Sequence, residues 1–199
     1  MSLAALILAA GTSSRMGTPK ALLEFQGDTF LDRLIGLFAP HCSPVLVVLG
    51  HQPDRIRAAL RRVAQVRFIH NPDYPQGQLT SLQCGLRALP PEADGVLFTP
   101  VDYPALQPST IQRLVQHAQI NPVPLLVIPR HLGRRGHPIC CSRQLIPELL
   151  ALPPDSQARV VIHRHLDHTC YVDVEDPGIL ADVDDPESYR RLIQPTPPQ

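Results

Sequence analysis

The sequence predicts an α/β protein built on a doubly wound, mostly parallel sheet with helices on both faces, a Rossmann-like arrangement. Short runs of almost continuously apolar residues alternate along the chain with segments of helical repeat. Strands that are apolar throughout are buried on both faces, which is typical of a parallel sheet covered by helices. The alternation itself predicts right-handed βαβ units.

Five apolar runs predict the strands in the first two thirds of the chain. They span residues 3–10, 45–50, 66–70, 95–101 and 124–129. Each is short enough for a strand and is followed by polar residues, Gly or Pro.

Three segments between these runs have apolar residues at the spacing i, i+3, i+4, i+7, within residues 31–38, 56–63 and 111–118. A similar apolar stripe lies within residues 79–89. We expect a helix at each, with its apolar stripe buried in the core.

The pattern is less regular after residue 129. There we expect strands near 137–141 and 169–174, and helices near 144–152, 158–165 and 186–193. We expect one domain over residues 1–193, followed by a disordered, Pro-rich tail over 194–199.

The composition favours a small-molecule partner over nucleic acid or a membrane. Lys+Arg and Asp+Glu both number 18, whereas bulk nucleic-acid binders usually have a basic excess. The N-terminal MSLAALILAAG lacks the pattern of a signal peptide and is far shorter than a membrane span. We therefore expect a cytoplasmic protein.

The five cysteines do not indicate a disulfide framework or a zinc ribbon. Their number is odd and no CxxC spacing occurs. We expect reduced thiols that mostly fill the core. Cys140 and Cys141 are adjacent, so in a strand they would point to opposite faces.

The predicted topology also indicates where ligands bind. In open parallel sheets, ligands lie beyond the carboxyl ends of the strands. The residues that follow the first four runs are Gly11, Gly50 with His51, Asn71, and Asp102. We expect the site to be built from these segments.

The loop after the first strand, LAAGTSSRMGTPK (8–20), has the composition of an anion-binding loop. We expect Gly11 and Gly17 to adopt positive φ and to allow close approach of a ligand, and Arg15 and Lys20 to neutralise phosphates. The spacing fits neither G-x-x-x-x-G-K-[ST] nor G-x-G-x-x-G. From the glycines alone, a solvated strand-to-helix turn is an equal alternative.

This loop resembles the N-terminal signature of the MobA-like nucleotidyltransferases, close to L-A-[AG]-G-x-S-x-R-M-G-x-x-K. Further segments resemble the family in the same order: NPDYPQGQLTSLQCGL (71–86), VDYPAL (101–106), RRGHPICCSRQL (134–145) and DPGILADVDDPESYRRL (176–192). The last two, and the Ala-Ala-Gly form of the loop, resemble the molybdenum cofactor cytidylyltransferase branch.

The resemblance implies an Mg²⁺-dependent enzyme that transfers a nucleotide from a nucleoside triphosphate, CTP in that branch, to a phosphorylated acceptor such as molybdopterin, releasing pyrophosphate. A molybdoenzyme is a possible protein partner. It implies that Asp102 binds Mg²⁺ and that the following residues bind nucleotide or acceptor: Ala9, Ala10, Gly11, Arg15, Lys20, Asn71, Ser81, Gly136 and His137. The alternatives are a turn role for Asn71, a helix-capping role for Ser81 and a structural role for His137.

Physical reasoning agrees with the assignment of Asp102. Mg²⁺ takes few protein carboxylates and keeps phosphate and water ligands. Asp182 and Asp184 are candidates for a second carboxylate, since residues i and i+2 of an extended segment point the same way. Alternatively, the aspartates of DDPESYRRL cap a helix.

Two departures from the family pattern concern the acceptor. Tyr103 stands where Gln or Met is common, and Gln157 stands where the cytidylyl branch often has Gly. They leave the identity of the acceptor open, with a sugar or alditol phosphate as the alternative. Apart from these departures, GTP as donor and a non-catalytic nucleotide- or cofactor-binding chaperone are further alternatives.

Overall fold

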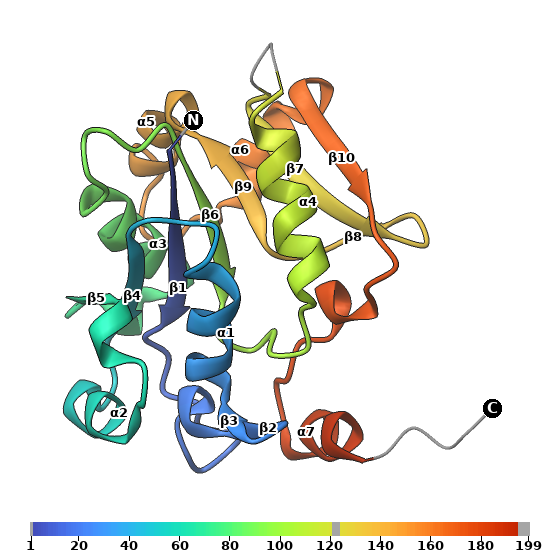
Figure 1. Cartoon of the computed structure of the whole chain (residues 1–199). Coiled ribbons are helices and arrows are strands. Elements are labelled where there is room, and N and C mark those ends of the chain that lie inside the picture. Colours follow the sequence, from blue (N-terminus) through green and yellow to red (C-terminus); the bar gives the residue numbers. More distant parts are fainter. Residues whose placement is uncertain (1, 121–123, 195–199) are drawn as a thin grey trace.

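An eight-stranded sheet forms the centre of the computed structural model, which describes residues 2–120 and 124–194 (Figure 1). Seven strands follow one another in the order β10-β7-β9-β6-β1-β4-β5, and β8 pairs with β7. Their bounds are β1 Leu3–Ala9, β4 Val45–Leu49, β5 Arg67–His70, β6 Gly95–Pro100, β7 Leu126–His131, β8 Arg134–Arg135, β9 Ile139–Ser142 and β10 Thr169–Asp173. The predicted doubly wound sheet is confirmed.

The strand order reverses between β1 and β6. From β1 the chain adds β4 and β5 on one side, then returns to add β6 on the other, with all four strands parallel. Leu8 pairs with Pro100, so the segments that follow β1 and β6 leave the sheet side by side. This reversal creates the crevice in which such folds bind ligands.

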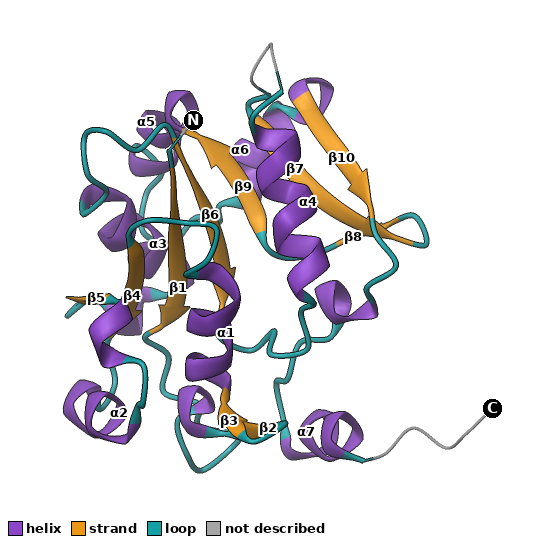
Figure 2. Ribbon diagram, viewed as in Figure 1, coloured by secondary structure: helices purple, strands orange, loops and turns teal. Residues whose placement is uncertain are grey.

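Helices cover both faces of the sheet (Figure 2). On one face lie α1 (Phe30–Phe38) and α4 (Pro108–Ala118), and on the other α3 (Gln78–Arg87), α5 (Ile146–Leu150) and α6 (Arg159–Arg164). The helices α2 (Pro53–Ala59) and α7 (Pro186–Ile193) lie at the end of the molecule toward which β1 points (Figure 1). The described residues also include six short 3₁₀ helices: η1 Lys20–Leu22, η2 Val63–Gln65, η3 Tyr74–Gln76, η4 Arg143–Leu145, η5 Leu166–His168 and η6 Pro177–Leu180.

The alternation of side chains along each strand divides the core into two layers. In β1, Ala5 and Ile7 face α1, while Leu6 packs toward α3, whose Gly85 has no room for a Cβ beside it. Cys140 and Cys141 also lie in opposite layers, as predicted. All five sulfurs are free thiols.

Tertiary contacts change several predicted bounds. The helix expected over 56–63 spans Pro53–Ala59 instead, and Val63 is exposed. The chain turns there because the backbone N–H groups of Arg61 and Arg62 donate to the buried carboxylate of Asp32.

Short paired segments escaped the sequence patterns. The hairpin of β2 (Glu24–Phe25) and β3 (Asp28–Thr29), and the strand β8, have only two residues each. β9 is antiparallel to both β6 and β7, a direction that its composition does not reveal. Residues 195–199 of the predicted tail lie outside the described residues.

Within the described ranges, none of the helices is both long and apolar enough to cross a membrane.

Candidate functional site

A cavity of about 570 Å³ lies where the strand order reverses. Its walls come from the loop after β1, the segment from Tyr74 to Ser81, the end of β6 and a residue near the C-terminus. The lining residues are Leu8–Arg15, Pro19–Ala21, Tyr74, Pro75, Gly77, Gln78, Ser81, Pro100–Asp102 and Asp184. The predicted residues Ala9, Ala10, Gly11, Arg15, Lys20, Ser81 and Asp102 are all among them.

The loop after β1 is held by its own polar groups. The backbone N–H of Lys20 donates to Ser13 Oγ at 2.9 Å, and the N–H of Met16 donates to the carbonyl of Ser13. Gly17 has a φ of +67°, as expected, but the expectation of a positive φ at Gly11 is wrong, and Ser13 takes that conformation instead. Gly11 faces open space, which leaves its backbone accessible to a ligand.

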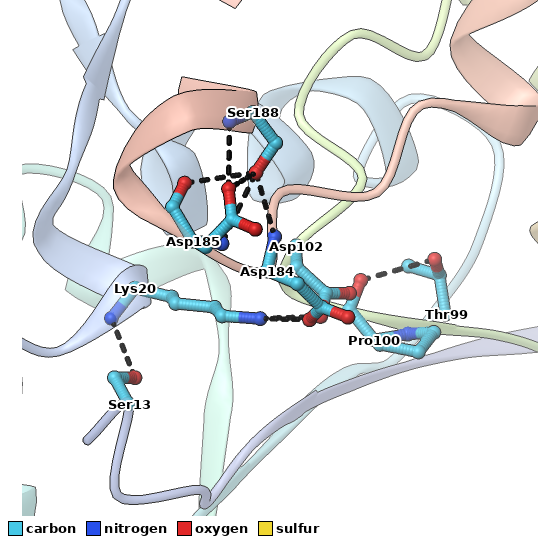
Figure 3. Close-up of polar contacts among 8 residues, drawn as sticks. All are labelled: Ser13, Lys20, Thr99, Pro100, Asp102, Asp184, Asp185 and Ser188. Atoms are coloured by element: carbon cyan, nitrogen blue, oxygen red, sulfur yellow. Dashed lines mark hydrogen bonds and ion pairs between the residues drawn. The ribbon is translucent and has the colours of Figure 1, made fainter. Parts of the chain in front are cut away.

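One ammonium group joins two carboxylates at the cavity (Figure 3). Lys20 Nζ lies 3.0 Å from Asp102 Oδ2 and 2.5 Å from Asp184 Oδ1. The backbone N–H of Val183 donates to the carbonyl of Asp102, which brings the C-terminal segment to the end of β6. The expected proximity of Asp102 to the loop is therefore present.

Burial and charge act against each other in this cluster. Burial lowers the pKa of Lys20, but the two carboxylates outweigh this effect, so the pKa lies above its ordinary value. Burial raises the pKa of Asp102, and Lys20 offsets that only in part. Asp102 Oδ1 is buried and has no hydrogen-bond partner among the described residues.

These carboxylates have the chemistry that a hard divalent cation requires. Mg²⁺ prefers anionic oxygen ligands and commonly uses one or two carboxylates together with phosphate oxygens. The unpartnered Oδ1 of Asp102 and the half-exposed carboxylate of Asp184 offer such ligands at the edge of a cavity. The residues present therefore fit Mg²⁺.

The structure separates the two aspartates proposed for the second carboxylate. Asp184 lines the cavity, whereas Asp182 is exposed. Burial and, as the next largest cause, the charge of Asp182 raise the pKa of Tyr103. The expected helix cap is Asp185, which accepts from the N–H of Ser188 in a capping box at the start of α7. Asp184 is consequently left available to Lys20.

Asn71 and Ser81 have different positions. Asn71 is buried, and its amide donates to Thr80 Oγ1 and Ser81 Oγ while its oxygen accepts from the N–H of Asp73. Of the two, only Ser81 lines the cavity. Asn71 thus orders the turn before α3 and presents Ser81.

A second cavity of about 560 Å³ adjoins the first. The two share Leu8, Gly77, Gln78 and Pro100, so a ligand in one lies next to a ligand in the other. Leu79, Leu82, Phe98, Ile139 and Ile162 contribute apolar surface, and Gln76, Asp155, Ser156, Gln157 and Arg159 contribute polar groups.

His137 belongs to the second cavity and not to the first. Its ring lies 4.7 Å from that of Tyr103, and burial lowers its pKa to about 4, so it is neutral near pH 7. Gly136 does not line either cavity. A Cβ there would lie 2.1 Å from the carbonyl oxygen of Ile179, so this position requires glycine.

Sequence analysis did not identify Asp176, a buried carboxylate that links these segments. Asp176 accepts from the backbone N–H groups of Gln107 and Gly178 and from Thr110 Oγ1. It thereby joins the start of α4 to η6, whose Ile179 carbonyl accepts from the N–H of His137. An aspartate before Pro-Gly was the available signal, but the pattern alone suggests only a turn.

Comparisons with known proteins agree with this geometry. Residues 5–169 match the profile of the MobA-like NTP transferase domain. The chain is 29% identical over 184 residues to the Escherichia coli K12 molybdenum cofactor cytidylyltransferase, covering 92% of each chain. It is 36% identical over 122 residues to a probable molybdenum cofactor guanylyltransferase of Synechococcus elongatus, covering 61% of each.

Among solved structures, Rv0371c of Mycobacterium tuberculosis H37Rv is similar throughout. It superposes with a TM-score of 0.81 at 28% identity, covering 98% of this chain and 100% of that one. A structure of Rv0371c in complex with manganese matches with a TM-score of 0.76 at 24% identity, covering 97% and 98%.

Proposed function

The chain belongs to the MobA-like NTP transferase family, whose profile matches residues 5–169, and is a nucleotidyltransferase; we propose that it transfers CMP from CTP to the phosphate of molybdopterin. Pyrophosphate is the second product, and the reaction depends on Mg²⁺. The observation that supports this proposal best is the meeting of Asp102, Asp184 and Lys20 at the cavity where the strand order reverses.

The first cavity is proposed to hold the nucleotide. Gly11 offers open backbone, and Arg15 and Lys20 supply positive charge for the triphosphate. Asp102 and Asp184 would hold Mg²⁺, which neutralises charge on the phosphates and on the leaving pyrophosphate. Ser81, near the start of α3, lines the same cavity and would contact the ribose or base.

The second cavity is proposed to hold the acceptor. Its apolar surface suits a planar ring system, and its amide, carboxylate and guanidinium groups suit the polar edge of a pterin. Because the cavities share a wall, the acceptor phosphate can be aligned with the α-phosphorus of CTP. The acceptor oxygen is itself the nucleophile, so the chain need only position the reactants and stabilise charge.

The E. coli relative supports CTP as the donor, and the Synechococcus relative makes GTP the second candidate. We further propose that the reaction takes place in the cytoplasm and that a molybdoenzyme is the protein that receives the product. Sugar and alditol phosphates remain alternative acceptors.

Pyrophosphate release from each of the four nucleoside triphosphates, with molybdopterin and Mg²⁺, tests the proposal. We expect release with CTP, a lower rate with GTP, and none with EDTA. No release with any triphosphate would refute molybdopterin as the acceptor. Nucleotide binding without exchange of labelled pyrophosphate into CTP would instead favour the non-catalytic chaperone.

Two neighbouring aspartates provide a matched pair for the same assay. Asp184→Asn should reduce the rate by about tenfold, since it removes a half-exposed charge from the site. Asp182→Asn makes the same substitution two residues earlier, outside the cavity lining, and should change little. Equal effects of the two variants would contradict the assignment of Asp184.

A further inference from the structure

Lys20 places its ammonium where a metal ion could contact both carboxylates. Its ammonium contacts both Asp102 and Asp184, within 3.0 Å of an oxygen of each (Figure 3). An ammonium and a divalent cation that both contacted these oxygens would repel each other strongly in a partly buried site. The two cations therefore cannot share this position.

We propose that Lys20 is a resident counter-cation that fills the cation site of the nucleotide-free protein and yields it when the triphosphate arrives. This inference rests on the proposed function, because it takes Asp102 and Asp184 as the metal ligands. Its consequence is an order of events: the free protein binds metal weakly, and nucleotide makes the site available.

The side chain of Lys20 has a second set of partners within reach. Its backbone is anchored at Ser13, while the four-carbon stem can rotate about that anchor. Lys20 lines the same cavity as Arg15, and this is the cavity proposed to hold the phosphates. A triphosphate would thus attract the ammonium at the moment when its metal ion needs the carboxylates.

The choice of residue type supports this exchange. Lys20 is the only lysine in the sequence, and all the other residues of the Lys+Arg total are arginines. A guanidinium would fork onto the carboxylates and hold them through several hydrogen bonds, whereas an ammonium is a compact, mobile charge. Lysine stands at the one place where a cation must be both held and released.

Burial makes the counter-cation necessary. The side chain of Asp102 is 19% exposed and that of Lys20 is 14% exposed, so water screens this pair only partly. Without Lys20, two carboxylates would face one cavity with no cation among their described contacts. Such a pair should bind a divalent cation more readily than the wild-type site does.

Titration of Mn²⁺ into the nucleotide-free protein, followed by the electron paramagnetic resonance signal of free Mn²⁺, tests the inference. We expect Lys20→Met to bind Mn²⁺ about tenfold more tightly than the wild type. Lys20→Arg should bind it no more tightly than the wild type, because the charge remains. In the wild type, a non-cleavable methylene analogue of CTP should lower free Mn²⁺ beyond the amount that the analogue binds in protein-free solution.

Arg15→Met is the matched control, since it removes a positive charge from the same cavity. Arg15 makes no ion pair with either carboxylate among the described residues. Its loss should leave the affinity for Mn²⁺ alone nearly unchanged and should weaken binding in the presence of the CTP analogue. An equal gain of Mn²⁺ affinity in Arg15→Met would show that the loss of any positive charge from the cavity has the same effect. That result would overturn the inference.

The single lysine also allows direct observation of the exchange. Protein labelled with ¹³C at lysine Cε has one such side-chain resonance, that of Lys20. We expect Mg²⁺ alone at low millimolar concentration to leave this resonance in place, and Mg²⁺ with the CTP analogue to shift it. A shift with Mg²⁺ alone would show that the metal needs no nucleotide to displace Lys20, which contradicts the inference.

The outcomes distinguish this inference from the proposed function. If Mn²⁺ binds together with the CTP analogue but Lys20→Met gains no affinity for Mn²⁺ alone, the exchange is refuted and the metal site stands. If the wild type binds Mn²⁺ neither alone nor with the analogue, the metal assignment itself fails, and the inference falls with it.

Discussion

The two halves of the molecule contribute to the site in different ways. Residues 3–102, called the nucleotide half after the ligand proposed for their loops, place polar residues directly after parallel strands, as with the loop after β1 and Asp102 after β6. Residues 103–193, called the acceptor half after the ligand proposed for the second cavity, contain the antiparallel β9 and bring Asp184 to the site through the segment after β10. The position of a residue thus depends on local topology in one half and on long-range contacts in the other.

In the acceptor half, buried polar groups hold the segments in place instead of a regular order of parallel strands. Asp176 links α4 to η6, Ile179 holds the loop of Gly136 and His137, and Val183 is bonded to Asp102. Such contacts connect residues far apart in sequence, so one substitution there should disturb several segments. The predictions below test this contrast.

The largest effect is expected from Asp102→Asn, in the nucleotide half. This substitution removes the more buried carboxylate, and kcat should fall by about 100- to 1000-fold, the loss typical of a preorganised electrostatic group. The pyrophosphate-release assay measures it, with circular dichroism as the control for folding. If kcat fell less in Asp102→Asn than in Asp184→Asn, the expectation that the nucleotide half contributes the more important carboxylate would be wrong.

A second prediction compares two buried carboxylates, one in each half. Asp176→Asn places an amide among three donors and should lower the free energy of unfolding by about 1–3 kcal/mol. It should also weaken Mn²⁺ binding in the presence of the CTP analogue, because η6 leads to Asp184. Urea unfolding and the Mn²⁺ titration measure the two effects.

Asp32→Asn is the matched control in the nucleotide half. Asp32 is fully buried and also accepts several hydrogen bonds, but it holds the chain after α2, away from the cavity lining. It should lower stability by a similar amount and leave Mn²⁺ affinity unchanged. Loss of affinity in both variants would mean that Asp176 acts only through general stability.

The smallest effect concerns the pH dependence of stability in the acceptor half. Burial lowers the pKa of His137 from 6.5 to about 4. Between these values the unfolded chain binds a proton that the folded chain does not, so stability should fall as the pH falls, by about 1 kcal/mol per pH unit. Above pH 6.5 this contribution is constant.

Urea unfolding at pH 7, 6 and 5 measures this slope. His137→Phe should reduce the slope, since it removes the group that the folded protein keeps neutral. His163→Gln, at an exposed position, should keep the wild-type slope. An unchanged slope in His137→Phe would show that His137 is not the source of the pH dependence.

Much of the nucleotide half could be predicted from the sequence. Apolar runs and helical stripes identified its main-sheet strands and main helices, because both faces of β1, β4 and β6 and the apolar side of each helix are buried. The bounds of α2 were wrong because Asp32, distant in sequence, binds the backbone after it. The two-residue strands were missed because they are too short to show a repeat.

The sequence by itself determined the alternating α/β order, the composition of the loop after β1, the position of Asp102 after a buried strand and the presence of a single lysine. Only the tertiary structure decided that Asp184 and not Asp182 contacts Lys20, that Asp185 takes the helix cap, and that Asp176 supports the acceptor half. The physical reason is the distance along the chain over which each property acts. Periodicity and strand ends are local properties, whereas these choices depend on buried hydrogen bonds and ion pairs between segments that meet only in the folded chain.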